Sequence, residues 1–272
     1  MSMTSIEPGD AVRRPLLQAR RIVIKVGSSL LTGRAGAGGE GGPPVIDGRS
    51  GLHLPFLQRL AQQITALRAS GREVALVTSG AVAAGVATLG IERPREIPRK
   101  QAAAAVGQSK LMHAYEEVFG VGDVQIAQVL ITHEDLAHRG RFLNARDTLR
   151  ALLEWRVLPI FNENDTVAVA EIKVGDNDNL SSLVASMIEA DLLILLSDVA
   201  GLYDADPRSV PTAARIPVVR RIDAAVRKLA GGAGTRAGTG GMITKIEAAE
   251  RAAASGIPTV IAAGTEPAIL QD

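Results

Sequence analysis

The chain has 272 residues, of which 46% are hydrophobic, so it can bury a substantial core and global disorder is excluded. Its 30 basic and 29 acidic residues give a net charge of +1, which provides no electrostatic basis for binding nucleic acid. The absence of cysteine excludes disulfides, thiolate metal sites and a cysteine nucleophile.

Residues 1–18 carry mixed charge without a hydrophobic period, and we expect this segment to be loosely ordered. The segment has no apolar core after basic residues, as a signal peptide would have. No apolar run reaches the ~20 residues that span a bilayer, and we interpret the run at 192–196 as a buried strand. We therefore expect a cytoplasmic protein that does not associate with membranes.

Short apolar runs alternate with stretches of helical period along the rest of the chain, and this alternation predicts a mostly parallel sheet with helices on both faces. Glycine-rich segments at 33–51 and 231–241 interrupt the pattern, and Pro159 predicts that one strand is less regular. The predicted strands are 22–27, 74–77, 125–131, 157–161, 192–196 and 259–261, and the predicted helices are 54–69, 101–119, 142–155, 180–189, 222–229 and 242–254.

Polar residues follow four of these strands directly. Ligands of parallel α/β sheets bind beyond the carboxyl ends of the strands, so these residues are candidates for one shared site. They are Gly-Ser-Ser at 27–29, Thr-Ser-Gly at 78–80, Asn-Glu-Asn-Asp at 162–165 and Ser-Asp at 197–198.

The densest polar cluster is the run Gly-Asp-Asn-Asp-Asn at 175–179, which is followed by an apolar stretch from Leu180. Capping a helix that starts at Leu180 needs one such side chain, and Asp178 could supply it. Two carboxylates and two carboxamides exceed that need. The cluster therefore predicts a site that grips a small polar molecule and a metal ion at the start of a helix.

Two lysines far apart in the sequence are candidates for binding phosphate. Lys25 ends an apolar strand, so it either contacts a phosphate together with the amides around Gly27 or reaches past the sheet edge to solvent. Lys245 falls in the first turn of a predicted helix, where a cation opposes the helix dipole and suggests a bound anion. The alternative for Lys245 is an ordinary flexible loop followed by a surface helix.

Several familiar motifs are incomplete. No Gly-Lys-[Ser/Thr] occurs, which excludes a Walker A loop, and two prolines follow the G-x-G-x-x-G at 36–41 where a helix should open. The His-Glu run at 133–138 misses the zinc-protease spacing by one position. Ser79 lacks a nucleophile elbow, so we interpret it as a ligand-binding hydroxyl. The polar turn at 204–208 either lines a nucleotide pocket or shapes a loop.

Several longer motifs can be compared as whole segments. They are Lys25–Gly27, Val77–Ala81, Phe142–Thr148, Asn162–Asp165, Glu171–Leu180, Gly201–Tyr203 with Asp206–Arg208, and Gly238–Met242 with Lys245. Together they resemble the glutamate 5-kinase family, a branch of the amino acid kinases, and the resemblance runs from residue 21 to residue 265.

This resemblance implies a three-layer αβα sandwich of the amino acid kinase and carbamate kinase type, formed by residues 19–272 without a C-terminal PUA domain. It implies a transferase that uses ATP to phosphorylate the side-chain carboxylate of L-glutamate. The product would be L-glutamyl 5-phosphate, at the first step of proline biosynthesis. The expected cofactors are ATP and Mg²⁺, with the metal held mainly through the ATP phosphates and no metal ligand from the protein.

The resemblance also implies roles for individual residues. Lys25 and Lys245 match the catalytic lysines, and Asp178 matches the acidic residue that organises them. The substrate-binding candidates are Ser79, Asp165, Asn177 and Asp176. The ATP-binding candidates are Lys25, Gly27, Ser197, Asp198, Thr239, Gly240, Gly241, Met242, Ile243, Thr244 and Lys245, and the family more often has Thr where Ser197 stands.

Two alternatives remain open at this point. The chain could be another kinase of the superfamily, acting on acetylglutamate, aspartate or a nucleoside monophosphate. It could also be a non-catalytic domain that senses glutamate or proline. The resemblance further suggests L-proline as a candidate feedback inhibitor and assembly into a dimer or tetramer. It assigns no role to the Gly-rich segment 33–47.

Overall fold

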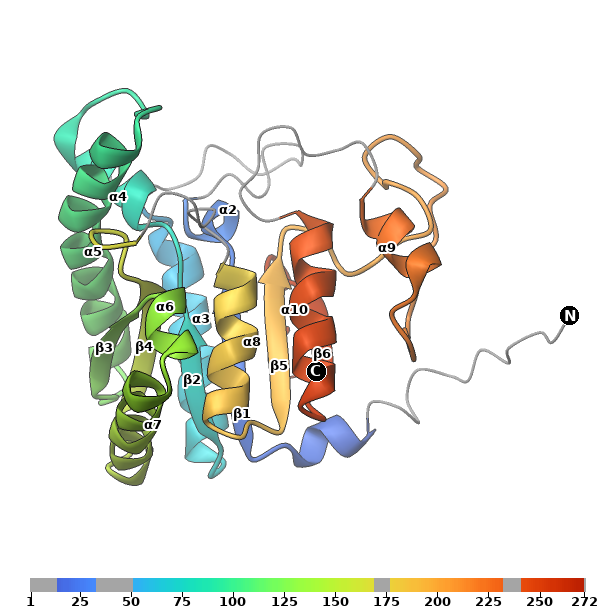
Figure 1. Cartoon of the computed structure of the whole chain (residues 1–272), viewed down its shortest axis with the longest axis horizontal. Coiled ribbons are helices and arrows are strands. Elements are labelled where there is room, and N and C mark those ends of the chain that lie inside the picture. Colours follow the sequence, from blue (N-terminus) through green and yellow to red (C-terminus); the bar gives the residue numbers. More distant parts are fainter. Residues whose placement is uncertain (1–13, 33–50, 169–176, 232–240, 272) are drawn as a thin grey trace, which may run out of the picture.

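The computed structural model describes residues 14–32, 51–168, 177–231 and 241–271. Within these residues, six parallel strands form one sheet in the order β3-β4-β2-β1-β5-β6 (Figure 1). The strands are β1 (Arg21–Val26), β2 (Glu73–Val77), β3 (Ile126–Ile131), β4 (Leu158–Glu163), β5 (Leu192–Ser197) and β6 (Thr259–Ala263).

Helices cover both faces of the sheet, which confirms the expected three-layer αβα sandwich (Figure 1). Helices α3 and α5 pack on one face, and α7, α8 and α10 pack on the other. The helices are α2 (Ser28–Leu31), α3 (Leu54–Ala69), α4 (Ala81–Leu89), α5 (Ile97–Gly120), α6 (His133–Ala137), α7 (Arg139–Glu154), α8 (Asn177–Met187), α9 (Ala224–Ala230) and α10 (Met242–Ala254), with the 3₁₀ helix η1 at Arg14–Gln18.

The alternation of side chains along β1 decides which layer each residue meets. Ile22 and Ile24 belong to the core cluster that includes α3 and α5, whereas Val23 belongs to the cluster that includes α8 and α10. Lys25 shares the parity of Val23, so the period of the strand directs its side chain toward α8 and α10. The sequence left two orientations open for Lys25, and in the structure its side chain points into the protein rather than past the sheet edge to solvent.

The strand order creates a topological switch point at β1. From β1 the chain runs through α2 and α3 to β2 on one side, whereas from β5, on the other side, it runs on to β6. Lys25 stands in register with Val77 of β2 and with Leu195 of β5. The carboxyl ends of these three strands therefore meet at one edge of the sheet, and ligands of such sheets bind in a crevice beyond that edge.

Several local predictions differ from the structure, including the starts of α5 at Ile97 and of α7 at Arg139, which lie four and three residues earlier than predicted. Residues 14–18 of the segment expected to be loosely ordered form η1, and Leu16 packs against the core, whereas residues 1–13 lie outside the described residues. Helix α8 begins at Asn177, three residues earlier than predicted, so Asp178 lies inside its first turn. Helices α4 and α6 were not predicted. Helix α4 is built from small residues without a polar face, and α6 is a five-residue helix with a capping box from Thr132 and Asp135.

The prediction that Pro159 makes its strand irregular is wrong. Strand β4 is buried along its whole length and pairs with β3 from Leu158 to Glu163. Leu158 donates its N–H toward β3, so the N–H that Pro159 lacks would face β2. Pairing with β2 starts only at Ile160, and the missing donor is therefore not needed.

Helices α4 and α5 approach each other closely beside the crevice. A Cβ added to Gly85 would lie 1.7 Å from the carbonyl oxygen of Ala103, and one added to Gly107 would lie 1.8 Å from that of Ala81. The two glycines thus allow backbone-to-backbone contact at the point where α4 leaves the Thr78–Gly80 turn. This contact fixes the position of α5 relative to that turn.

We expect Gly107→Ala to destabilise the fold by about 1–3 kcal/mol, because the new methyl group must push α4 and α5 apart. Gly120→Ala on the same helix is the matched control, since no atom lies within 4 Å of its added Cβ. The control should be neutral or stabilising by about 0.5–1 kcal/mol. Urea unfolding of both variants measures the difference, and equal midpoints would contradict the close-contact interpretation.

Candidate active site

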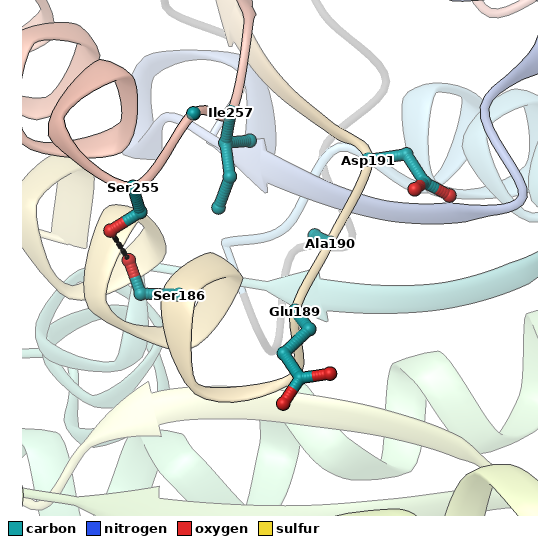
Figure 2. Close-up of a pocket in the computed structure, with 7 residues that line it drawn as sticks. Ser186, Glu189, Ala190, Asp191, Ser255 and Ile257 are labelled. Atoms are coloured by element: carbon teal, nitrogen blue, oxygen red, sulfur yellow. Dashed lines mark hydrogen bonds between the residues drawn. The ribbon is translucent and has the colours of Figure 1, made fainter.

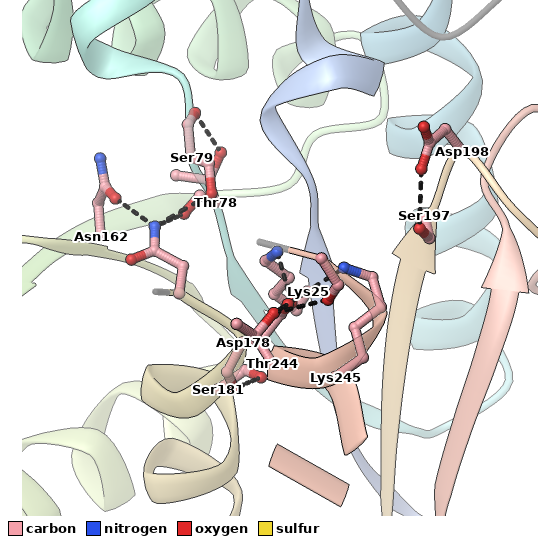
Figure 3. A network of polar contacts seen from close by, with 12 residues as sticks. Lys25, Thr78, Ser79, Asn162, Asp178, Ser181, Ser197, Asp198, Thr244 and Lys245 are labelled. Atoms are coloured by element: carbon pink, nitrogen blue, oxygen red, sulfur yellow. Dashed lines mark hydrogen bonds and ion pairs between the residues drawn. The ribbon is translucent and has the colours of Figure 1, made fainter. Parts of the chain in front are cut away.

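Two lysine side chains share one carboxylate in the crevice (Figure 3). Lys25 Nζ lies 2.6 Å from Asp178 Oδ1, and Lys245 Nζ lies 3.1 Å from Asp178 Oδ2. All three residues are buried, with relative exposures of 5%, 4% and 1% for Lys25, Lys245 and Asp178. The candidate lysines, far apart in the sequence, therefore meet at one point.

Three elements deliver these charges to the same place. Lys25 comes from β1, Asp178 is the second residue of α8, and Lys245 is the fourth residue of α10. Helices α8 and α10 lie side by side on the sheet face to which Lys25 points (Figure 1). Two ammonium groups against one carboxylate leave an excess of one positive charge in a buried setting, which favours binding an anion.

The environment of Asp178 determines its ionisation. Burial disfavours the charged carboxylate, but the positive charges of Lys25 and Lys245 and hydrogen bonds from Lys25 and Thr244 outweigh that effect and lower the pKa of Asp178 to about 2. The Thr244 hydroxyl lies 2.7 Å from Asp178 Oδ2. Asp178 is therefore an anion at neutral pH, and it acts as an ionic partner rather than as the helix cap considered from the sequence.

A second, uncharged network lies on the β2 and β4 side of the lysines (Figure 3). The Asn177 side-chain amide donates to the Thr78 carbonyl oxygen, to Ser79 Oγ at 3.1 Å and to Asn162 Oδ1 at 2.9 Å. Gly80, with φ of 95°, makes the left-handed turn that separates Ser79 from α4. Candidate residues Ser79 and Asn177 are thus in direct contact.

Asp165 lies at the same edge, two residues after the end of β4. Burial, with a further contribution from the charge of Glu163, raises the pKa of Asp165 to about 6. Glu163 is itself buried, and His133 Nδ1 lies 3.8 Å from its Oε1. Asp165 therefore sits where its charged form would be stabilised by a cationic ligand.

Ser197 and Asp198 lie at the end of β5, on the opposite side of the lysines from the amide network (Figure 3). Ser197 Oγ donates to Asp198 Oδ1 at 3.1 Å, and Arg208 Nη2 lies 2.9 Å from Asp198 Oδ2. The turn at 204–208, whose role the sequence left open, therefore reaches the end of β5 through Arg208.

The remaining ATP-binding candidates are placed in part. The N–H of Gly27 donates to the carbonyl oxygen of Leu196 at 3.3 Å, so that amide is already engaged. Gly241 is the N-cap of α10, and no side chain among the described residues caps it, which leaves the amides of Met242, Ile243 and Thr244 without an intrahelical acceptor and suited to an anion. Asp176, Thr239 and Gly240 lie outside the described residues.

The structure adds neighbours that were not among the candidates. Asn162 bridges Asn177 to Gln108 of α5, and the Thr78 hydroxyl lies 2.7 Å from the buried Tyr115 hydroxyl. Asn162 belongs to a quoted motif, which could have identified it. Gln108 has no sequence signal, because a glutamine on a helix is ordinarily a surface residue.

A shallow hollow lies far from this crevice, at the C-terminal ends of α8 and α10 (Figure 2). Its polar groups serve structural contacts. Ser186 and Ser255 share a hydrogen bond of 2.8 Å, and the Asp191 carboxylate accepts the backbone N–H groups of Arg20 and Arg21. The hollow therefore contributes nothing to the candidate site.

In the part of the chain that the structure describes, no group of three or more His, Asp or Glu residues is arranged to hold a metal ion. No described helix is long and apolar enough to cross a bilayer.

Comparison with known proteins identifies relatives at the level of sequence. Residues 20–263 match the model of the amino acid kinase family. Glutamate 5-kinases from Geobacter sulfurreducens and Meiothermus ruber are 52% and 53% identical to this chain over 258 and 249 residues. These alignments cover 94% and 91% of this chain but 65% and 62% of the relatives, so the chain spans less than two thirds of their length.

Solved structures support the fold. An isopentenyl phosphate kinase aligns with a TM-score of 0.60 at 18% identity, covering 92% of this chain and 94% of its own. The UMP kinase from Ureaplasma parvum aligns with a TM-score of 0.54 at 16% identity, covering 93% of each chain. At these identities the likeness extends to the architecture alone.

We expect Asp178→Asn to destabilise the protein by about 3–5 kcal/mol at pH 7, because two buried ammonium groups lose their counterion. Asp198→Asn is the matched control, since its partly exposed pair with Arg208 should cost at most about 1 kcal/mol. Urea unfolding at pH 7 measures both.

The same substitution predicts a change in acid stability. The pKa of Asp178 is lowered on folding, so its ionised form stabilises the fold above its ordinary value of 3.8, and this contribution disappears as pH falls through about 2. The Asp178→Asn variant has no carboxylate to protonate at this position and should lack that loss. An unchanged difference in unfolding free energy between wild type and variant from pH 7 to pH 2 would contradict the assignment.

Proposed function

This chain belongs to the amino acid kinase family, and we propose that it transfers the γ-phosphoryl group of ATP to the side-chain carboxylate of L-glutamate. The product would be L-glutamyl 5-phosphate, the first intermediate on the way to proline. The similarity to glutamate 5-kinases supports this choice within the family. The observation that carries it is the pair of buried ammonium groups on Asp178 at the switch point of the sheet.

Phosphoryl transfer needs alignment and charge neutralisation more than covalent help from the protein. ATP and glutamate are both anions, so they repel each other when they meet. Lys25 and Lys245 would offset that repulsion and the charge on the transferring group. Asp178 would hold the two ammonium groups together beside the transferring group.

The nucleotide would lie toward β5 and α10. The uncapped amides at the start of α10 would bind its phosphates, and Ser197 and Asp198 would line the pocket. The expected Mg²⁺, held mainly through the ATP phosphates, would supply charge neutralisation there. A metal held through the phosphates fits this site, because both oxygens of Asp178 already face lysines.

Glutamate would lie toward β2 and β4. Asn177 and Ser79 would hydrogen-bond the substrate, and Asp165 would pair as an anion with its α-ammonium group. The attacking carboxylate has a reference pKa of about 4.3 and is ionised at neutral pH, so no general base is required. Asp176 would join this group from the same polar run.

The remaining expectations are part of the proposal. Residues 19–272 would act as the kinase domain of a cytoplasmic enzyme that assembles as a homo-oligomer. L-proline, the end product of the pathway, would be its feedback inhibitor.

A coupled assay with ATP, Mg²⁺ and L-glutamate tests the proposed activity, with N-acetyl-L-glutamate, L-aspartate and UMP as competing acceptors and L-proline as inhibitor. We expect ADP release that depends on L-glutamate. ADP release that depends instead on another acceptor would assign the chain to a different branch of the family. Nucleotide binding in calorimetry without turnover on any acceptor would favour a sensor.

We expect Lys245→Ala to lower kcat about 100–1,000-fold, because it removes one of the two cations that stabilise the transferring group. Lys228→Ala on α9 is the matched control, since Lys228 is exposed and carries the same charge. Retention of wild-type turnover by Lys245→Ala would refute the role assigned to Lys245.

The raised pKa of Asp165 predicts the pH dependence of glutamate binding. Below about pH 6 the carboxyl group is neutral and no longer pairs with the α-ammonium group, so kcat/KM for glutamate should fall as pH drops through that value. The α-ammonium group of bound glutamate favours the ionised form of Asp165. The acidic limb of the kcat profile should therefore lie at lower pH than that of the kcat/KM profile. Asp165→Asn should raise the glutamate KM and remove the limb from the profile. A limb that persists in the variant would point to another group.

A further inference from the structure

Three side-chain amides form a chain across the proposed glutamate site. Asn177 donates to Asn162 Oδ1 at 2.9 Å, and Asn162 Nδ2 donates to Gln108 Oε1 at 2.8 Å. The chain thus links the first turn of α8, through the end of β4, to the middle of α5. Gln108 is its last member and belongs to none of the motifs identified in the sequence.

Backbone groups fix the orientation of every amide in this chain. The N–H of Glu163 can only donate, and it lies 3.0 Å from Asn162, so the atom that it meets must be Oδ1. The carbonyl oxygen of Thr78 can only accept, so the Asn177 atom that it meets must be Nδ2. If the side-chain amide of either asparagine were rotated by 180°, two donors or two acceptors would face each other. Neither amide can therefore flip.

The consequence reaches Gln108. Because Asn162 Oδ1 is occupied by two donors, Asn162 Nδ2 must face α5, where it needs an acceptor. Gln108 Oε1 supplies that acceptor, although Gln108 Nε2 is then left buried without a hydrogen-bond partner among the described residues. An unpaired buried donor destabilises the fold, so the orientation is dictated by the bond to Asn162 and not by the needs of Gln108 itself.

The position of Gln108 is fixed by its neighbour. Gly107 brings the backbone of α5 into contact with Ala81 and Gly85 at the start and middle of α4. Helix α4 begins directly after the turn that carries Ser79. The acceptor for Asn162 is therefore held on a backbone that is itself braced against the same site.

We propose that Gln108 is a positioning residue for the acceptor substrate, acting through Asn162 to hold the amide of Asn177. This inference rests on the proposed function, since it assumes that Asn177 binds glutamate. Gln108 contacts neither of the lysines nor Asp178. Its effect should therefore fall on glutamate binding and leave the nucleotide unaffected.

Gln108→Met tests the proposal, because methionine keeps the length of the side chain and removes the acceptor. We expect the glutamate KM to rise about 3–10-fold, as a lost neutral hydrogen bond predicts, while the ATP KM and kcat change by less than about twofold. Gln108→Glu keeps an oxygen at the accepting position and should return the glutamate KM to within about threefold of wild type. Ser109→Ala is the control, since that exposed hydroxyl bonds only within its own helix.

The outcomes separate the possible roles. If Gln108→Glu impairs glutamate binding as much as or more than Gln108→Met, an accepting oxygen at this position does not restore the site, and the positioning role is overturned. An unchanged glutamate KM in Gln108→Met would also overturn it. If Gln108→Met does not fold, Gln108→Ala, which adds no bulk, replaces it.

A measurement without turnover distinguishes failure of this inference from failure of the proposed function. In ¹⁵N-labelled protein, Gln108→Met should shift the side-chain amide resonances of both Asn162 and Asn177, whereas Ser109→Ala should leave them in place. If the Asn177 resonances do not move, the positioning role of Gln108 is overturned, whichever substrate the enzyme phosphorylates. If they shift in a protein that does not turn over glutamate, the link from Gln108 to Asn177 is retained and the assigned substrate is refuted.

Discussion

The structure depends on a single carboxylate that holds two cations inside the protein. Lys25 and Lys245 could not both stay buried without Asp178, because each ammonium group would lose its hydration and repel the other. The register of β1 and the starting points of α8 and α10 are therefore constrained together. A shift of any one element by a residue would remove a charge from the group, which makes this ion cluster the reference point for the geometry around it.

On either side of that cluster, the side chains offer different chemistry. Toward β2 and β4 they are amides and hydroxyls, which impose direction, together with the carboxyl group of Asp165. Toward β5 and α10 they are helix amides and an acid–base pair, which suit a polyanion. Under the proposed function, this division would let two negatively charged molecules occupy adjoining halves of one crevice. The parallel sheet makes this separation possible, because strands on opposite sides of β1 end at the same edge.

Much of this could be predicted from the sequence, and the exceptions have physical causes. Apolar periodicity located all six strands and the longer helices, but α4 escaped because its small residues are stabilised by contact with α5 and not by an amphipathic face. Composition marked the run containing Asp178 as functional, yet could not separate a helix cap from an ion pair. That distinction depends on Lys25 and Lys245, which only the tertiary structure brings near. Gln108 was missed for the same reason: its partner Asn162 lies on another element.

Asn177 and Asp178 are consecutive residues in the first turn of α8, yet one faces the amide network and the other faces the lysines. A helix moves as a stiff rod, so its end cannot reposition one of these side chains and leave the other behind. Under the proposed function, a displacement of this turn by one reactant would also move the side chain that faces the other. The two halves of the site would then be mechanically linked through adjacent residues of one helix.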